Sequence, residues 1–393
     1  MRRLIVVSAV ALALAGPAAA SLGTKLDTAL RVPHVSLAAT GAVAIDLTTG
    51  ETLYSRNATL PLLPASNEKL TVTYAALTAL GPDFRIETDV LQDDTGDLIL
   101  KGYGDPTLST AQLNVLARQV RASGITHVTG AVLADESWFD TRRTASGWKA
   151  SFYIEESPPL SALIVNRGIV GRVTSHDPAL AAAQEFRTAL VRAGVTVAGA
   201  AAHGNAPADA TLVASVDSPA LLSIVHWMDI TSDNFYAEML VKELGAVQAG
   251  KGTTAAGVGY VTGLLQQAGV PLAGVRLVDG SGLSLLDRLT TGSLASLLSL
   301  MWNDLDLRLE LVDSLPVAGH SGTLVDRMRH TVAAGVVHAK TGTTDNASAL
   351  SGFVGDRYVF SVLQNGWPVS WTWARKAQDR FATALAGAAE QSQ

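Results

Sequence analysis

Three short patterns along this chain carry residue types that together could form a serine-based acyl-transfer site. A serine hydroxyl is a weak nucleophile until a nearby base takes its proton. A lysine can be that base only when burial or a neighbouring cation lowers its pKa. The patterns that supply these groups are Ser66-x-x-Lys69, Ser232-x-Asn234 and Lys340-Thr341-Gly342.

The first pattern stands where a helix should begin. Residues 70–80 are rich in Ala and Leu and predict a helix that Gly81-Pro82 ends. Because residues three apart share a helix face, Ser66 and Lys69 can touch at its first turn. Free N–H groups and the positive dipole end there would suit an oxyanion on a substrate. Ser66 taken alone could equally be a helix N-cap, so the other two patterns decide the interpretation.

The second pattern would complete a proton path between two lysines. Lys340 is the cation that we expect to help lower the pKa of Lys69. Ser232 would bridge the two lysines and pass a proton to the leaving amine. Asn234 would donate its side-chain amide to the substrate backbone.

The third pattern predicts an edge strand that binds substrate. Thr341 and Thr343 would bind a substrate carboxylate together with Lys340. Gly342 would let the substrate backbone approach closely, because glycine carries no side chain.

Further copies of the first two patterns are less well placed. Ser146-Gly147-Trp148-Lys149 repeats the first, and Ser55-Arg56-Asn57 repeats the second, whereas Lys-Thr-Gly occurs once. Gly147 and the following Pro158-Pro159 leave no predicted helix to hold Ser146 against Lys149. The sequence therefore favours Ser66 over Ser146 as the nucleophile.

Other catalytic chemistries find little support. The chain has 8 His residues, and none stands in a Gly-x-Ser-x-Gly or His-Glu-x-x-His pattern. His320, His330 and His338 are interpreted as packing or surface residues. Residues 101–106 form a glycine-rich turn and not a phosphate-binding loop. These patterns therefore favour neither a histidine-based hydrolase nor a phosphate-binding enzyme.

Composition excludes two broad classes of protein. Hydrophobic residues make up 48% of the 393-residue chain and charged residues 16%, which excludes a disordered protein. The formal net charge is −6, whereas a nucleic-acid binder needs a basic face. We therefore expect no nucleic acid as a partner.

The N-terminal segment has the pattern of a secretory signal peptide. Arg2 and Arg3 precede the apolar run 4–15, and three alanines end at Ala20. The run of about 12 residues is shorter than the roughly 20 that a membrane-spanning helix needs. We expect cleavage of residues 1–20, no transmembrane segment afterwards, and export to a periplasmic or extracellular (cell-wall) location. Cysteine is absent, so neither a lipoprotein anchor nor a disulfide is expected.

The remaining chain divides into an outer and an inserted part. Residues 41–57 predict a β-hairpin, and 336–340, 349–355 and 358–364 predict three consecutive strands before a closing helix at 371–388. Further helices are predicted at 232–246, 258–268 and 291–302. We expect one sheet built from both ends, in a domain of residues 21–81 and 216–393. Residues 82–215 would form an inserted, mainly β domain with one or two helices, for example 179–193.

Longer stretches around these patterns resemble the class C penicillin-binding proteins of low molecular mass, the D-alanyl-D-alanine carboxypeptidase and endopeptidase family. The likeness extends over nearly all of the chain after residue 20. A long insert between Ser66 and Ser232 is typical of this family. The matching blocks are 64–70, 102–108, 135–140, 232–238, 279–284, 317–324 and 339–343.

The resemblance implies an α+β fold, with a transpeptidase-like (serine β-lactamase-like) domain of central antiparallel sheet and flanking helices. It implies that Ser66 attacks the penultimate D-alanine of peptidoglycan stem peptides with Lys69 as general base. Ser232 would protonate the leaving amine, and backbone N–H groups of Ser66 and Thr343 would bind the oxyanion. Water would release the shortened peptide from the acyl-enzyme, and β-lactams would trap Ser66 covalently. The resemblance implies no metal and no cofactor.

Two alternatives remain from the sequence. A β-lactamase or esterase on the same fold would turn penicillin over rapidly, but the large insert argues against it. A non-catalytic wall-binding or β-lactam-sensing protein is also possible, although every catalytic residue type is present. The balance between carboxypeptidase and endopeptidase activity stays open.

Overall fold

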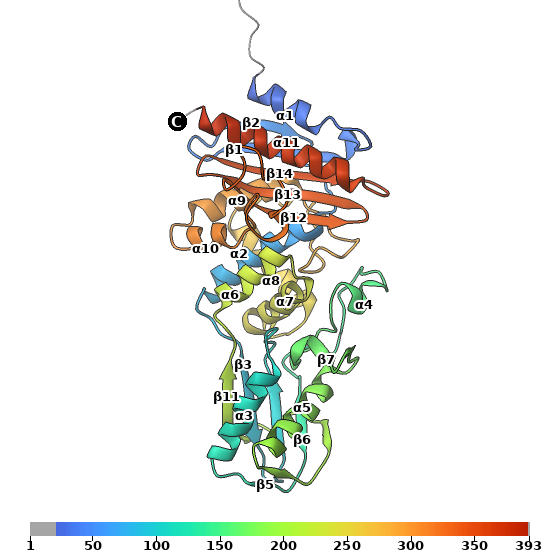
Figure 1. Cartoon of the computed structure of the whole chain (residues 1–393), viewed down its shortest axis with the longest axis vertical. Coiled ribbons are helices and arrows are strands. Elements are labelled where there is room, and N and C mark those ends of the chain that lie inside the picture. The colour runs from blue at the N-terminus through green and yellow to red at the C-terminus, as the bar shows by residue number, and fades with distance from the viewer. Residues whose placement is uncertain (1–20, 392–393) are drawn as a thin grey trace, which may run out of the picture.

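The computed structural model describes residues 21–391, so the predicted signal peptide at 1–20 lies outside the described residues. Two five-stranded sheets lie at opposite ends of an elongated molecule, with a layer of helices between them (Figure 1). Within the described residues, no helix is both long and apolar enough to cross a membrane.

The first sheet joins the two ends of the chain. Its strand order is β12-β13-β14-β1-β2, and all neighbours are antiparallel. The β1–β14 ladder connects the N-terminal hairpin to the C-terminal strands, which confirms the predicted single sheet. The strands are β1 (Thr40–Asp46), β2 (Thr52–Arg56), β12 (Val337–Thr344), β13 (Ala347–Val354) and β14 (Tyr358–Asn365).

Strand β12 is longer than the sequence indicated. We predicted a strand at 336–340, but pairing with β13 continues as far as Thr344. Residues 341–344 are threonines and a glycine, so they carry no apolar alternation that would reveal a strand. The Lys340-Thr341-Gly342 pattern therefore lies inside the edge strand of the sheet.

Helices cover both faces of this sheet. Helices α1 (Leu22–Leu30) and α11 (Trp371–Glu390) cover one face (Figure 1), and their apolar side chains share a core with β13 and β14. The opposite face packs against a second core that includes α2 and α9. The helices on that side are α2 (Lys69–Leu80), α6 (Leu221–Thr231), α7 (Asn234–Ala249), α8 (Thr254–Gln267), α9 (Thr291–Asn303) and α10 (Arg308–Asp313).

Local capping defines where these helices begin and end. The side chain of Asp233 accepts from the Tyr236 N–H and caps α7. Ser232 has a left-handed backbone with φ of 62° at the end of α6. The predicted helix at 232–246 therefore starts two residues later, because Ser232 belongs to the turn between α6 and α7.

The second sheet has the order β10-β6-β4-β3-β11 and mixes parallel and antiparallel pairs. Helices α3 (Thr110–Ala122) and α5 (Pro178–Arg192) share one apolar core with it. Its strands are β3 (Glu87–Gln92), β4 (Leu98–Gly102), β6 (Val132–Asp135), β10 (Ala201–His203) and β11 (Thr211–Asp217). Smaller elements in this part are β5 (His127–Val128), β9 (Thr196–Val197), β7 (Ile169–Val170), β8 (Val173–Thr174) and α4 (Phe152–Glu155).

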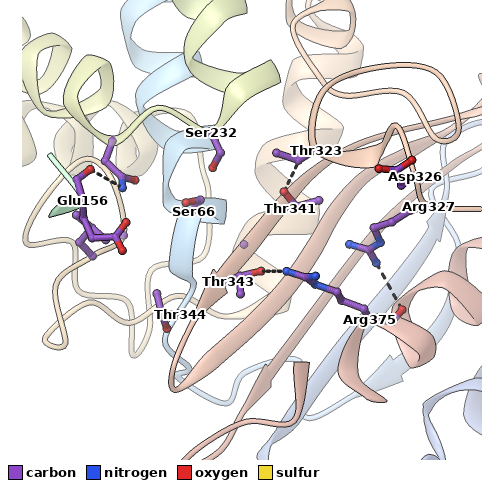
Figure 2. Close-up of a pocket in the computed structure, with 14 residues that line it drawn as sticks. Ser66, Glu156, Ser232, Thr323, Asp326, Arg327, Thr341, Thr343, Thr344 and Arg375 are labelled. Carbon is purple, nitrogen blue, oxygen red and sulfur yellow. Dashed lines mark hydrogen bonds between the residues drawn. The ribbon is translucent and has the colours of Figure 1, made fainter. Parts of the chain in front are cut away.

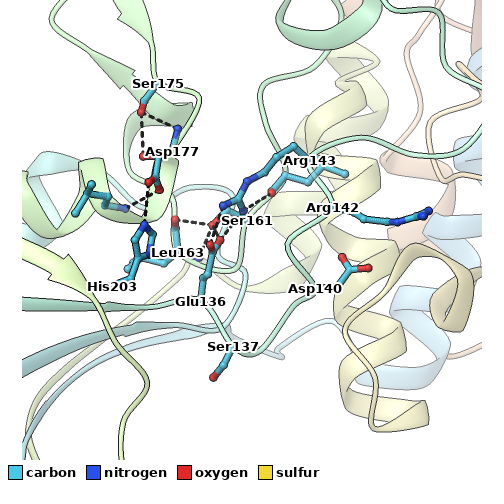
Figure 3. Close-up of polar contacts among 12 residues, drawn as sticks. Glu136, Ser137, Asp140, Arg142, Arg143, Ser161, Leu163, Ser175, Asp177 and His203 are labelled. Atoms are coloured by element: carbon cyan, nitrogen blue, oxygen red, sulfur yellow. Dashed lines mark hydrogen bonds and ion pairs between the residues drawn. The ribbon is translucent and has the colours of Figure 1, made fainter.

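Polar contacts fasten the segment after β6. Arg143 forms an ion pair of 2.5 Å with Glu136, which also accepts from Ser161 Oγ at 2.6 Å (Figure 3). Between these contacts, Asp140 pairs with the fully buried Lys242 of α7 at 2.5 Å. The segment therefore links the second sheet to the helical layer through a buried cation whose charge is compensated.

Candidate active site

Ser66 lies in a single 3-10 turn, η2 (Ala65–Glu68), directly before α2. The next residue, Asn67, is fully buried and donates its amide to the Lys340 carbonyl at 2.9 Å. Its Oδ1 accepts from Ser351 Oγ at 2.6 Å. Asn67 therefore fixes the turn that carries Ser66 against strands β12 and β13.

Lys69 makes three hydrogen bonds from its ammonium group. Nζ donates to Ser66 Oγ at 3.0 Å, to Asn234 Oδ1 at 2.8 Å and to the Ser281 carbonyl at 2.8 Å. The side chain is fully buried, and this burial lowers the pKa of Lys69 to about 8. Lys69 is thus positioned to take the Ser66 proton near neutral pH.

Lys340 forms a second lysine–serine pair on the other side of the groove. Its Nζ donates to Ser232 Oγ at 2.8 Å and to the Thr341 carbonyl at 3.1 Å. Burial, and next the charge of Lys69, lower the pKa of Lys340 to about 7. We predicted that Lys340 would depress the pKa of Lys69; burial is the main cause for both lysines, and the repulsion lowers that of Lys340.

Ser232 does not bridge the two lysines as we had expected. In the described part of the chain its Oγ has a hydrogen bond to Lys340 and none to Lys69. Asn234 instead reaches Lys69 through Oδ1, and its Nδ2 donates to the Glu156 carbonyl at 3.1 Å. The left-handed backbone at Ser232 turns this short segment so that both side chains face the groove.

A loop that sequence reasoning left without a role supplies the Ser281 carbonyl. Buried Asp279 accepts from the N–H groups of Gly282 and Ser284, and Glu238 accepts from those of Gly280 and Ser281. The two carboxylates hold this backbone in place for Lys69. The block 279–284 was visible in the sequence, but the acceptor is a main-chain oxygen, which no residue type announces.

The edge strand β12 presents its threonines to the groove. Thr341 Oγ1 donates to Thr323 Oγ1 at 2.7 Å, and Thr343 Oγ1 accepts from Arg375 at 3.3 Å (Figure 2). Gly342 lies against the nucleophile turn, where an added Cβ would be 3.0 Å from the Pro64 carbonyl oxygen. Glycine at 342 thus allows the turn to pack closely against strand β12. That it also lets the substrate backbone approach closely stays a prediction.

These groups converge on one groove of about 500 Å³ (Figure 2). Lys69 and Lys340 are buried and hydrogen-bond the two serines that line it. Its lining consists of Ser66, Glu156, Ser232, Asn234, Gly282, Leu283, Thr323, Asp326, Arg327, Thr341, Gly342, Thr343, Thr344 and Arg375. The structure therefore brings together every residue that the three sequence patterns supplied.

The rival serine lies elsewhere. Ser146 lines a different cavity, and Lys149 forms an ion pair of 2.7 Å with Asp345. No helix holds these two residues, as the sequence indicated.

A group of buried acidic side chains lies next to Lys69. Carboxylate oxygens of Glu68, Asp279 and Asp287 are all within 4.8 Å of one another. Burial and the neighbouring carboxylates raise the pKa of Glu68 well above its usual value and that of Asp287 to about 10. Carboxylate oxygens in this arrangement could hold a hard cation. Protons shared among the three carboxyl groups would neutralise the same negative charge, so the cluster alone assigns no metal.

Comparison with known proteins agrees with this geometry. Residues 22–176 and 171–387 match the family described as D-Ala-D-Ala carboxypeptidase 3 (S13). A D-alanyl-D-alanine carboxypeptidase of Actinomadura sp. (strain R39) is 34% identical over 88% of this chain and 81% of its own length. The crystal structure of penicillin binding protein 4 from Haemophilus influenzae has a TM-score of 0.81 at 21% identity, covering 93% of this chain and 98% of that one.

A second crystal structure of the Haemophilus influenzae protein contains a bound β-lactam. It has a TM-score of 0.75 at 20% identity and the same coverage of 93% and 98%. At this level of identity the two structures show that the chains share a fold.

Proposed function

The chain belongs to the D-Ala-D-Ala carboxypeptidase 3 (S13) family, and we propose that it is a serine D-alanyl-D-alanine carboxypeptidase or D,D-endopeptidase of peptidoglycan. The observation that carries the proposal is the pair of lysine–serine contacts, Lys69–Ser66 at 3.0 Å and Lys340–Ser232 at 2.8 Å, in one groove. Two buried lysines of lowered pKa beside two serines favour acyl transfer without metal chemistry.

Acylation would begin at Ser66. Lys69 takes the hydroxyl proton while Ser66 Oγ forms a bond to the carbonyl carbon of the penultimate D-alanine. When the C–N bond breaks, Ser232 gives its proton to the departing amine and recovers one from Lys340. Water then attacks the ester, Lys69 returns its proton to Ser66 Oγ as the shortened peptide leaves, and a proton from the water restores the charge of Lys340.

Backbone and side-chain donors would hold the substrate during this step. The N–H groups of Ser66 and Thr343 would bind the oxyanion, because the first precedes α2 and the second lies on the edge strand. The amide of Asn234 has a second N–H for the substrate backbone beyond its bond to Glu156. Thr341, Thr343 and Lys340 would bind the substrate carboxylate.

The proposal includes the domain division and the location. Residues 82–215 would be the inserted domain. The second sheet begins at Glu87 and ends at Asp217, which supports this division to within two residues at its C-terminal boundary. Residues 1–20 would direct export, which a substrate outside the cytoplasm requires. β-Lactams would acylate Ser66 as substrate analogues.

Intact-mass spectrometry of the protein with benzylpenicillin, sampled over hours and followed by peptide mapping, tests the proposal together with release of D-alanine from a stem pentapeptide. We expect a lasting adduct on the Ser66 peptide and free D-alanine. Ser66→Ala should abolish both, and Ser146→Ala should abolish neither. Rapid loss of penicillin without an adduct would favour a β-lactamase, and intact drug with no D-alanine release would favour a non-catalytic protein.

A further inference from the structure

The first turns of α11 lie along the end of the edge strand that borders the groove. Trp371 Nε1 donates to the Thr344 carbonyl at 2.8 Å, and Arg375 Nη2 donates to Thr343 Oγ1 at 3.3 Å. Residues 371 and 375 are four apart and therefore share one face of the helix. This face aims the Arg375 guanidinium at the threonine that ends the Lys-Thr-Gly-Thr run (Figure 2).

The charge of Arg375 is not compensated by the protein. Its neighbour Arg327 pairs with Asp379 at 2.6 Å, and Asp326, another groove residue, pairs with Arg329. Among residues 21–391, no carboxylate lies within ion-pairing distance of Arg375. An arginine stays charged at any working pH, so this end of the groove carries a permanent positive charge that can bind an anion.

Lys340 is a weak source of positive charge at the same place. Burial, and next the charge of Lys69, lower the pKa of Lys340 to about 7, so part of its positive charge is lost near neutral pH. Its Nζ is also engaged with Ser232 and the Thr341 carbonyl. A substrate carboxylate bound at Thr343 would therefore be stabilised more strongly by Lys340 and the exposed Arg375 guanidinium together than by Lys340 alone.

We propose that Arg375 is a substrate-binding residue that recognises the free α-carboxylate of the leaving residue, in concert with Thr343 Oγ1. This inference rests on the proposed peptidase function, which it deepens by adding a residue that distinguishes a leaving residue with a free carboxylate from one without it. A neutral amide at that position loses the ionic part of the contact and keeps the rest of the site.

The test compares an Nα,Nε-diacylated Lys-D-Ala-D-Ala peptide with its C-terminal carboxamide. We expect Arg375→Ala to raise KM for the carboxylate peptide about tenfold, as the loss of a charge-assisted hydrogen bond would. KM for the carboxamide and both kcat values should stay within about twofold. Arg375→Lys should recover part of the loss.

Arg380→Ala is the matched control, because Arg380 is exposed on the same helix and does not line the groove. It should leave both KM values unchanged. In Arg375→Ala, an equal rise in KM for both peptides, or no rise for either, would overturn the inference. An equal rise would indicate that the substitution displaces strand β12. A wild-type protein that neither cleaves these peptides nor reacts with benzylpenicillin would instead refute the proposed function, and the inference with it.

Discussion

Asn67 donates a hydrogen bond of 2.9 Å to the main-chain carbonyl of Lys340, although 273 positions separate the two residues. One contact therefore joins the turn that carries Ser66, the proposed nucleophile, to the strand that we propose binds substrate. Ser351 Oγ, on the neighbouring strand β13, donates to Oδ1 of the same asparagine at 2.6 Å. The relative position of Ser66 and strand β12 thus depends on a buried amide that takes no part in the chemistry.

Asn67→Ala should weaken both the fold and the reaction. The change removes a buried donor to the Lys340 carbonyl and leaves the Ser351 hydroxyl with Ser361 as its side-chain partner, which costs about 1–3 kcal/mol of unfolding free energy. Benzylpenicillin should acylate Ser66 about tenfold more slowly, because its turn is no longer fixed. Urea unfolding and stopped-time mass spectrometry measure the two effects. Asn303→Ala, at an exposed site, should change neither, and a normal acylation rate in Asn67→Ala would contradict this role.

Acylation should have a bell-shaped pH dependence with its maximum between pH 7 and 8. Lys69 must be deprotonated to accept the Ser66 proton, so the rate rises with pH toward its pKa of about 8. Lys340 must be protonated to bind a carboxylate, so binding weakens as pH rises through about 7. We expect kcat/KM to fall on both sides. A flat profile from pH 6 to pH 9 would contradict the assignment of the two lysines.

Buried acids should make the fold less stable as pH rises. Burial raises the pKa of Glu238 to about 8 and that of Asp287 to about 10, and that of Glu68 is also raised. At pH values between the unfolded pKa near 4.5 and these raised pKa values, the folded chain binds more protons than the unfolded chain does. Each such proton lowers the unfolding free energy by about 1.4 kcal/mol per pH unit.

Glu68→Gln should therefore reduce this pH dependence, because the amide needs no proton to remain neutral. Unfolding free energies from urea titrations at pH 6 and pH 9 should differ less in the variant than in the wild type. Glu51→Gln, at an exposed turn, is the control and should keep the wild-type difference. An unchanged pH dependence in Glu68→Gln would show that Glu68 is already ionised in the fold over this range.

The sequence predicted those parts of the site that local patterns determine. Ser66 and Lys69 are three residues apart at a helix start, so their contact follows from helix geometry. The hairpin and the three C-terminal strands alternate in polarity or form apolar runs, and their pairing follows from one sheet built from both ends of the chain.

Other parts of the site depend on contacts that cannot be predicted from residue types. The Ser281 acceptor for Lys69 is a main-chain oxygen, held by Asp279 of the same loop and by the distant Glu238. Arg375 comes from the last helix and meets Thr343 only because α11 packs on the sheet. The left-handed turn at Ser232 also escaped prediction, since serine there reads as the start of a helix.

Gly342→Ala should impair the reaction by separating strand β12 from the nucleophile turn. A methyl group at 342 would lie 3.0 Å from the Pro64 carbonyl oxygen and 3.1 Å from the Cβ of Ala65, so the turn must shift. We expect a stability loss of about 1–3 kcal/mol and acylation by benzylpenicillin at least about tenfold slower. Gly263→Ala is the matched control, because nothing lies within 4 Å of its added Cβ inside α8. That change should stabilise the helix by about 0.5–1 kcal/mol and leave acylation unchanged, whereas wild-type acylation in Gly342→Ala would show that the turn tolerates displacement.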